Sequence, residues 1–551
     1  HAIAPAQCTS TIDRRMTRLA SLMLGLKIWD IIAAMTRYLY LTVYCAGMPT
    51  LAIELTASRL LGAVFGTSNL VWASIIGLIL IYLAVGYFLG GRWADRSPYL
   101  KTMYTILAWG ALAAGLIPLI ARPVLSLAAD AFDQLQVGVL IGSFSVVLVL
   151  FSLPIILLGT ISPFAIRLGI GDPAEAGRVA GRVYAISTLG SFVGTFLPVL
   201  VSIPLLGTTL TFALFSGLLL CVALAGLWLN GDRKRVLQYI WMPLALLIST
   251  LLILNRPIKS SEGQIFESES AYNYIQVLEK DGYHLLRLNE GQGIHSVWHP
   301  DRLDYYGPWE MVLVAPFFNQ APYELDELDR LAIIGLAGGT IARQVSEVYG
   351  SIPIDGYEID PEIIEIGRQY FAMNQPNLVA HAEDGRWGLA RSEAHYDVIA
   401  LDAYRPPYIP WHLTTVEFFQ VVHDHLTEDG VVAINVGSAP GDTKLLESII
   451  ATMGRVFPSI YVVDVPGSYN SVVFATSQPT EIENLYQNYL HLEEGDPPHP
   501  LLMDAYRRVI VNLQPNLDGG IVFTDDRAPV EWITNNMVLN FIFFEGMEDL
   551  N

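Results

Sequence analysis

The stretch LAIIGLAGGTIARQ, residues 331–344, joins a short apolar strand to a glycine-rich turn and the start of a helix. Four apolar residues form the strand, and the turn GLAGGT follows at residues 335–340. Glycine allows backbone conformations that other residues avoid and lets a ligand come close, while the first amides of the next helix attract anionic groups. This strand–turn–helix unit predicts an α/β fold with a ligand site at the carboxyl end of the strand.

Six more short apolar strands follow the first one, and helical stretches separate most of them. Strands that alternate with helices predict a mostly parallel, doubly wound sheet with a Rossmann-like arrangement. Upstream, apolar and polar residues alternate in AYNYIQVLE and YHLLRL, which predicts a small antiparallel sheet. The predicted strands of the main sheet are residues 331–334, 352–358, 378–381, 397–401, 431–436, 460–465 and 471–476.

A carboxylate follows each of the next three strands after the glycine turn. Glu358 can accept both ribose hydroxyls of a nucleotide, Asp384 can accept from an adenine amine, and Asp402 ends the fourth strand. A single aspartate after a strand is more often a helix N-cap. The glycine turn and these three carboxylates nevertheless occupy four consecutive strand ends, which favours a nucleoside cofactor site over a set of helix caps. The glycines assigned to that site are Gly335, Gly338 and Gly339.

Composition divides the chain into two unlike halves. Hydrophobic residues make up 52% of the 551 residues, and the mean hydropathy is +0.42, which predicts a membrane part. Residues 1–255 carry a net charge of +7 and residues 256–551 a net charge of −28. An acidic domain repels phosphates, so we expect no nucleic-acid partner. The three cysteines lie far apart and form no metal-ligand pattern, so no metal site is expected.

Seven apolar stretches approach the roughly 20 residues needed to cross a bilayer. Residues 17–36 include Lys27 and Asp30, which favour an interfacial helix over an eighth span. We therefore expect an N-terminal segment at 1–36, a membrane domain at 37–255, a small β-subdomain with linker at 256–325 and a Rossmann-like domain at 326–551. The predicted spans are residues 39–62, 69–91, 103–121, 136–159, 183–205, 208–229 and 237–254.

Basic residues gather in alternate loops of the membrane half, and all of these loops fall on one side of the predicted bundle. The positive-inside rule makes that side cytoplasmic and delivers the acidic half to the outer side. The basic loop residues are Arg92, Arg96 and Lys101 in the first loop, Arg167, Arg178 and Arg182 in the second, and Arg233, Lys234 and Arg235 in the third.

The motifs GLAGGTIARQ, GYEIDPEII, AEDGR and VIALDAY, in this order, resemble the spermidine synthase family of aminopropyltransferases. AYNYIQV and YYGPWEMVL resemble the N-terminal β-domain of that family, and the resemblance covers roughly residues 262–480. The membrane half, with AIELTASRLLG, GGRWADR and AGRVYAISTLGS, is similar to multi-span bacterial proteins that carry such a domain behind a helix bundle. IPWHLTTVEFF and TDDRAPVEW fit the same group, which implies a multi-pass protein of the bacterial plasma membrane.

The resemblance implies a class I methyltransferase fold and decarboxylated S-adenosylmethionine, or S-adenosylmethionine, as the cofactor. It assigns Glu358 to the ribose, Asp384 to the adenine and Asp402 to the catalytic base. Gly338 stands where the family has an aspartate that contacts the cofactor's amino group. Arg405 stands where the family has a second acidic residue that helps to hold the polyamine. The nucleoside pocket is thus expected to be kept and the acceptor pocket to be altered.

Arg405 bears most directly on the acceptor. At about 5 Å and an effective dielectric near 20, one contact between like charges costs roughly 3 kcal/mol. Either Arg405 points away, or the acceptor is anionic or lipidic instead of a simple polyamine. For His412 the alternatives are an acid–base or lid residue and a loop histidine bonded to backbone, and we favour the second. The acceptor-binding candidates are Tyr274, Gln276, Glu310, Tyr404, Arg405 and His412.

Two functions follow from these observations. The first is a membrane-anchored transferase that uses an adenosyl-sulfonium cofactor and a polyamine or other small-molecule acceptor, with Asp402 as the base. The second is a catalytically inactive domain that serves as a binding or structural subunit of a membrane complex and faces outside. Cofactor chemistry places the domain in the cytoplasm and loop charges place it outside, so its side stays open. A transporter is a third, less supported alternative.

Overall fold

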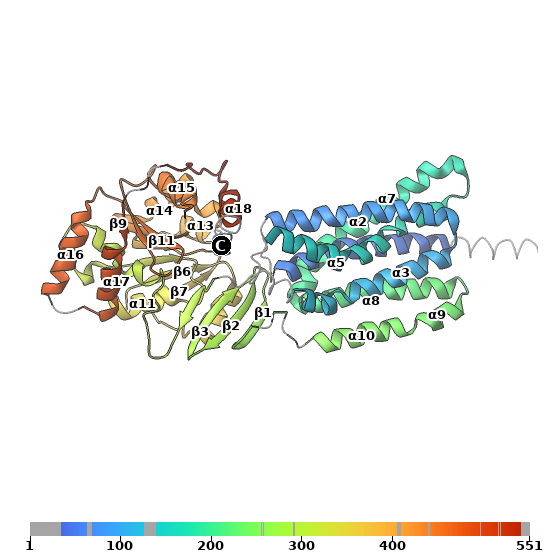
Figure 1. Cartoon of the computed structure of the whole chain (residues 1–551), viewed down its shortest axis with the longest axis horizontal. Coiled ribbons are helices and arrows are strands. Elements are labelled where there is room, and N and C mark those ends of the chain that lie inside the picture. Colours follow the sequence, from blue (N-terminus) through green and yellow to red (C-terminus); the bar gives the residue numbers. More distant parts are fainter. Residues whose placement is uncertain are drawn as a thin grey trace, which may run out of the picture. The chain divides into compact units, whose positions relative to one another are not determined.

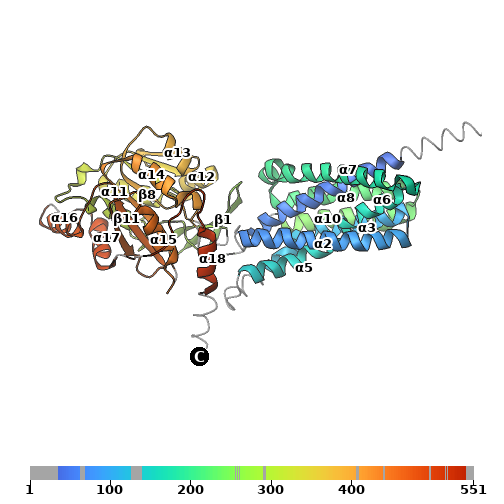
Figure 2. The same ribbon diagram turned by 90° about the horizontal axis from the view of Figure 1, so that it is seen from above.

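The computed structural model describes residues 35–62, 69–125, 139–254, 261–289, 293–404, 409–438, 441–495, 498–515 and 519–540, with residues 256, 258, 259 and 517. The chain forms two compact units, and the main change from one to the other falls between Arg256 and Pro257. The first unit is helical and the second combines helices with two sheets (Figures 1 and 2). The interfacial helix predicted at 17–36 lies outside the described residues, except for residues 35 and 36.

Among the described residues of the first unit, five helices are long and apolar enough to cross a membrane, or six if one bent pair counts as a span. The sequence had predicted seven spans. The difference lies in Pro173–Leu229, a single helical run that contains two of the predicted spans. The other candidates are Met35–Gly62, Val71–Arg96, Phe144–Gly169 and Arg233–Ile253, with the bent pair Leu100–Gly115 and Ile117–Leu125.

The run Pro173–Leu229 is 57 residues long, which at 1.5 Å per residue is roughly 85 Å and far exceeds the thickness of a bilayer. Gly207 interrupts it, with φ 75° and ψ 174°, a conformation that glycine adopts without strain. This break falls between the predicted spans at 183–205 and 208–229. The elements of the run are η1 (Pro173–Glu175), α7 (Ala176–Leu197), the π-helical turn η2 (Pro198–Ser202) and α8 (Ile203–Leu229).

The three basic loops of the first unit lie at the same end of its helices. Arg167 forms an ion pair with Asp95 at 3.2 Å, which joins the second loop to the first. Arg235 donates to the carbonyl oxygen of Lys101 at 3.3 Å, which joins the third loop to the first. The remaining helices are α2 (Asn69–Arg96), α3 (Leu100–Gly115), α5 (Val139–Gly159), α6 (Ile161–Gly169), α9 (Arg233–Tyr239) and α10 (Trp241–Ile253).

The second unit contains a four-stranded antiparallel sheet and an eight-stranded mixed sheet. The small sheet has the order β1-β2-β3-β4, and the large one has the order β12-β10-β11-β9-β8-β5-β6-β7. Strands β5 to β9 run parallel, whereas β10, β11 and β12 pair in antiparallel fashion. The small sheet comprises β1 (Gln264–Glu269), β2 (Tyr274–Lys280), β3 (Tyr283–Leu288) and β4 (Ser296–Trp298).

All seven strands predicted for the large sheet are confirmed, with ends that move by a few residues. The two-residue strand β12 (Leu513–Gln514) was not predicted. The observed bounds are β5 (Leu331–Ile334), β6 (Ile354–Glu358), β7 (Leu378–Ala382), β8 (Tyr396–Leu401), β9 (Leu426–Gly437), β10 (Ser459–Asp464) and β11 (Asn470–Thr476).

Alternate residues of the central strands belong to two separate apolar cores, one on each face of the large sheet. Ile333 and Val398 belong to one core, and Ile334 and Ile399 belong to the other. A strand that is buried on both faces reads as a continuous apolar run, which is why these strands were recognisable. Figure 1 shows helices on both sides of the sheet. On one face lie η3 (Glu310–Phe318), α11 (Thr340–Tyr349), α16 (Ile482–Glu494) and α17 (Pro500–Val511), and on the other lie α13 (Gly385–Arg391), α14 (Val416–Asp424), α15 (Lys444–Met453) and α18 (Val530–Asn540).

Candidate active site at the carboxyl ends of the strands

The order of the strands reverses between β5 and β8. The chain proceeds from β5 to β6 and β7 on one side, and β8 then pairs with the other edge of β5. Gly335 has φ 90°, and a Cβ there would lie 2.5 Å from the backbone nitrogen of Ala403. The amide of Asp402 also donates to the carbonyl oxygen of Ile334 at 2.8 Å. The turns after β5 and β8 therefore touch at the switch point, where such sheets bind ligands.

Besides Gly335, the glycine turn has positive φ at two further positions. Ala337 has φ 47°, and Gly339, which precedes α11, has φ 81°. The amide of Gly338 donates to Oγ of Ser296 at 2.8 Å, and a Cβ at position 338 would lie 2.9 Å from Cβ of Ser296 and 3.1 Å from Phe371. The place that the resemblance assigns to an aspartate is thus filled by neighbouring side chains.

Glu358 ends β6 with its carboxylate bonded to backbone amides. One oxygen accepts from the amide of Ala337 at 3.0 Å, and the other accepts from the amide of Asp360 at 3.1 Å. Burial removes the side chain from water and raises the pKa of Glu358 to about 7, although the hydrogen bonds from the two amides act to lower it. Glu358 therefore fixes the shape of the glycine turn and keeps one further lone pair on each oxygen for a ligand.

Asp384 both caps α13 and binds a histidine. One oxygen accepts from the amide of Trp387 at 2.9 Å, and the other lies 2.9 Å from Nε2 of His412. The hydrogen bond with His412 holds the pKa of Asp384 below its ordinary value. The side chain of His412 thus contacts a carboxylate and not the backbone, contrary to the preferred interpretation of the sequence.

A second carboxylate group of the same region was missed. Asp525 accepts two hydrogen bonds from Arg386, both at 2.7 Å, and one from Thr415 at 2.7 Å. Arg386 also donates to the carbonyl oxygen of His412 at 3.0 Å. Asp525 belongs to the motif TDDRAPVEW, and the likeness of this motif to the multi-span bacterial proteins was the available signal. The pairing with Arg386 could not be predicted because the two residues are 139 positions apart.

Asp402 begins the loop after β8 and holds one hydrogen bond on each carboxylate oxygen. Nε1 of Trp309 donates to one oxygen at 3.1 Å, and Nδ2 of Asn435 donates to the other at 2.9 Å. Burial raises the pKa of Asp402 to about 6, although both donors favour the ionised form. Tyr404 lies beside this group, with its hydroxyl above Gly437 of β9, and burial raises its pKa as well.

Trp309 and Asn435 are two further site residues that sequence reasoning missed. Asn435 comes from a buried strand and is 9% exposed, and Trp309 precedes η3. The side-chain oxygen of Asn435 has no hydrogen-bond partner among the described residues and lies next to Asp402. A polar side chain in the apolar run VVAINV was the signal that could have identified Asn435.

The side chains of three remaining acceptor candidates bond to other segments, and a fourth lies outside the described residues. Tyr274 and Gln276 bond to the segment around Lys259, on the face of β2 opposite to the apolar cluster of Ile275 and Val277. Both carboxylate oxygens of the fully buried Glu310 are taken up by nearby groups, namely the amides of residues 305 and 307 and the amide of residue 344. Arg405 lies outside the described residues.

The fold and the strand ends together define an α/β domain with a small-ligand site. One wall is a glycine turn fixed by a buried carboxylate, and the adjacent wall presents Asp402, a partly desolvated acid whose orientation is set by two donors. Such a carboxylate can accept a proton from a reacting group.

Comparison with known proteins agrees with this class. Residues 314–487 match the spermine/spermidine synthase domain. The chain is 32% identical over 253 residues to the polyamine aminopropyltransferase of Vibrio vulnificus, covering 43% of this chain and 81% of that protein. It is 29% identical over 281 residues to a probable polyamine aminopropyl transferase of Bifidobacterium longum, covering 48% of this chain and 61% of that protein.

Among solved structures, a spermidine synthase in complex with the transition-state analogue AdoDATO shares 20% identity and has a TM-score of 0.37. The match covers 46% of this chain and 84% of that one. The chain spans less than two thirds of the length of the Bifidobacterium relative. The chain belongs to the polyamine aminopropyltransferase family, and its second unit is a spermidine-synthase-like domain that follows a helical unit with five or six candidate membrane spans.

Proposed function

We propose that this chain is a membrane-anchored transferase that uses decarboxylated S-adenosylmethionine, or a related adenosyl-sulfonium compound, with Asp402 as the general base. The observation that carries the proposal is the setting of Asp402 at the switch point, beside the glycine turn and between two hydrogen-bond donors. We assign the cofactor to Gly335, Gly338, Gly339, Glu358 and Asp384. The membrane is proposed to be a bacterial plasma membrane, with the active domain on the cytoplasmic side, where the cofactor is available.

In the proposed reaction, an amine nitrogen forms a bond to the carbon attached to the sulfonium, and the carbon–sulfur bond breaks. The sulfur takes the electron pair and leaves as the neutral thioether methylthioadenosine, and Asp402 takes the proton that the amine must lose. An alkyl amine has an unperturbed pKa of about 10.4, so it arrives protonated. A carboxylate with a pKa of about 6 is a better base than an ordinary aspartate, and general bases of this kind contribute about 10²–10⁴-fold to rates.

We propose that the acceptor differs from simple polyamines. Arg405 stands at the family's second acidic position, so a cationic acceptor would lose one attraction and gain one repulsion. Ser296 and Phe371 fill the space that a longer residue at Gly338 would need, which supports a changed contact with the cofactor's tail. An acceptor with a single amine and an anionic or apolar remainder fits these residues.

One observation favours the alternative, an inactive domain that serves as a subunit of a membrane complex. The carboxylate of Asp384 already binds His412 and the amide of Trp387, so an adenine amine would compete with an existing partner. The charges of the membrane loops also favour an outward-facing domain, where no adenosyl cofactor is available.

Calorimetry of the full-length chain in detergent, titrated with methylthioadenosine, distinguishes the two functions. At pH 8, where Glu358 is mostly ionised, we expect saturable binding at one site and a loss of about 10-fold to 100-fold in affinity for Glu358→Gln, because a charged acceptor of the ribose hydroxyls is replaced by a neutral one. Glu365→Gln is the matched control, since Glu365 lies on the exposed side of α12 (Pro361–Tyr370) and its ion pair among the described residues is with Arg368.

Two outcomes oppose the enzyme. Absence of binding at millimolar methylthioadenosine favours the inactive subunit. Equal binding by the Glu358→Gln variant and the unaltered chain places the ligand elsewhere and rejects the proposed cofactor site. Release of methylthioadenosine from decarboxylated S-adenosylmethionine, measured with a panel of amines, then identifies the class of acceptor.

A further inference from the structure

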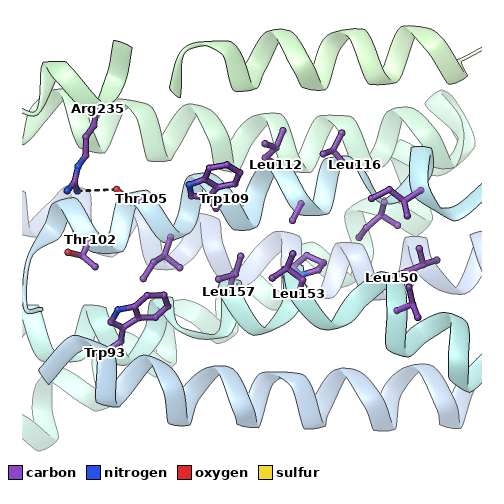
Figure 3. Close-up of a pocket in the computed structure, with 16 residues that line it drawn as sticks. Trp93, Thr102, Thr105, Trp109, Leu112, Leu116, Leu150, Leu153, Leu157 and Arg235 are labelled. Atoms are coloured by element: carbon purple, nitrogen blue, oxygen red, sulfur yellow. Dashed lines mark hydrogen bonds between the residues drawn. The ribbon is translucent and has the colours of Figure 1, made fainter. Parts of the chain in front are cut away.

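The helical unit contains a groove with a volume of about 660 Å³ that the proposed transferase reaction does not use. It lies between α2, α3, the helix Ile117–Leu125 and α5, and the start of α9 reaches it at one end (Figure 3). Its wall is almost entirely apolar, so a ligand that fills it must offer an apolar chain. The apolar lining includes Trp109, Leu112, Leu116, Leu150, Leu153 and Leu157.

The groove is open along the outside of the helices. Val149 and Leu153 of α5 are both 60% exposed, and Trp109 of α3 is 45% exposed. Exposed apolar side chains on helices of this composition face lipid tails in a membrane. An occupant can therefore enter sideways from the bilayer without passing through water.

One end of the groove is polar and cationic. Arg235 donates from Nη1 to Oγ1 of Thr105 and to the carbonyl oxygen of Lys101, both at 3.3 Å, and its Nε lies 3.4 Å from Asp232. Among the described residues, Nη2 of Arg235 has no hydrogen-bond partner. Figure 3 shows Thr102 and Trp93 at the same end as Arg235, whereas Leu116 and Leu150 lie toward the other end. The groove is thus polar and cationic at one end and apolar along the rest of its length, which suits an amphiphilic ligand.

Its dimensions and charge agree with a membrane lipid. From Thr105 to Leu116 the helix rises by roughly 16 Å at 1.5 Å per residue, which is about half of the ~30 Å hydrocarbon core. The ion pair with Asp232 offsets the charge of Arg235, but the three basic loops at this end together carry nine Lys and Arg residues against four acidic ones, so the end stays positively charged. Such clusters attract anionic headgroups, and an arginine can hold a phosphate with two parallel donors.

We propose that this groove binds one anionic phospholipid, with an acyl chain along the apolar wall and the phosphate on Arg235. The charge of the headgroup then decides retention, since the apolar wall accepts any chain of suitable length. The site is independent of the reaction of the second unit, so its test does not depend on catalysis.

Native mass spectrometry of the full-length chain in detergent tests the proposal after the chain is delipidated and incubated with phosphatidylglycerol or phosphatidylcholine of identical acyl chains. We expect one retained phosphatidylglycerol and at least about 10-fold weaker retention of phosphatidylcholine. Arg235→Gln should abolish the preference, and Arg235→Lys should keep part of it, because the charge stays but the two parallel donors of the guanidinium are lost. Ala113→Phe, which fills the groove, should reduce retention of both lipids.

Arg233→Gln is the matched control, because Arg233 lies on the same short helix but stacks over Trp228 and does not line the groove. It should retain phosphatidylglycerol as the unaltered chain does. Equal retention of phosphatidylglycerol by the Arg235→Gln variant, or an equal loss in Arg233→Gln, overturns the proposal. Thermal unfolding of each variant identifies those that fail to fold, and Ala113→Phe still decides the outcome if Arg235→Gln is among them, because unchanged retention by that variant would place the lipid outside the groove.

Discussion

Replacing Asp402 with asparagine should stabilise the second unit while removing its proposed base. Burial raises the pKa of Asp402 from 3.8 to about 6, a shift of about 2 units that corresponds to roughly 3 kcal/mol at 1.36 kcal/mol per unit. That free energy opposes folding when Asp402 is ionised. Asparagine carries no charge, but one of the two donors, Trp309 or Asn435, would then face its amide group, at a cost of about 1–2 kcal/mol.

The sign of the pH dependence follows from linkage. Because the native pKa lies above the unfolded one, the contribution of Asp402 to stability is greatest below about pH 4 and is lost as the pH rises through about 6. The Asp402→Asn variant should therefore be more stable than the unaltered chain by about 1–2 kcal/mol at pH 8, and nearly equal to it at pH 5. For a domain of this size, this is a rise in Tm of about 2–6 °C at pH 8.

Thermal unfolding of the full-length chain in detergent at the two pH values measures this difference. Asp397→Asn is the comparison variant, because Asp397 lies near the start of the same strand and accepts from two backbone amides and from Thr427. It should lower the Tm at both pH values. If Asp402→Asn lowers the Tm at pH 8 as Asp397→Asn does, Asp402 stabilises the fold and the reasoning is refuted.

Three further perturbations test other contacts. Gly338→Asp should lower the Tm, since its Cβ would lie 2.9 Å from Cβ of Ser296, and adding Ser296→Gly should restore part of the loss; no recovery would mean that another neighbour limits the space. Trp309→Phe removes a hydrogen-bond donor to the ionised Asp402 and should raise its pKa. The acidic limb of the pH–rate profile for methylthioadenosine release should then move to a pH above 6, and an unchanged limb would exclude Asp402 as the titrating base. Gly207→Ala should destabilise the helical unit by about 1–3 kcal/mol in thermal unfolding, because φ 75° with ψ 174° is a conformation essentially restricted to glycine, and a neutral effect would show that the break can relax.

The strands of the large sheet could be predicted because burial on both faces leaves continuous apolar runs, which polar turns interrupt. The placing of Glu358, Asp384 and Asp402 at strand ends followed from the same pattern. The hydrogen-bond partners of these carboxylates could not be predicted, because Asp384 binds a histidine 28 residues away and Asp402 binds a tryptophan 93 residues before it. Contacts over such separations depend on the packing of turns, which a single sequence does not specify.

Tyr274 and Gln276 illustrate a different limit. Residues two apart on a strand share a face, so these two side chains of β2 lie together. The alternation of residues along the strand does not show which part of the chain each face of β2 contacts. In the structure, Ile275 and Val277 pack with Ile363, while the polar pair faces the segment around Lys259.

The close approach at Gly335 has a consequence for how this domain can change. Its missing side chain lets the turn after β5 rest directly on the backbone of residues 402 and 403. A displacement of the glycine turn is therefore transmitted to the loop of Asp402 without an intervening side chain. The turns after β5 and β8 are thus expected to shift as one unit when either of them moves.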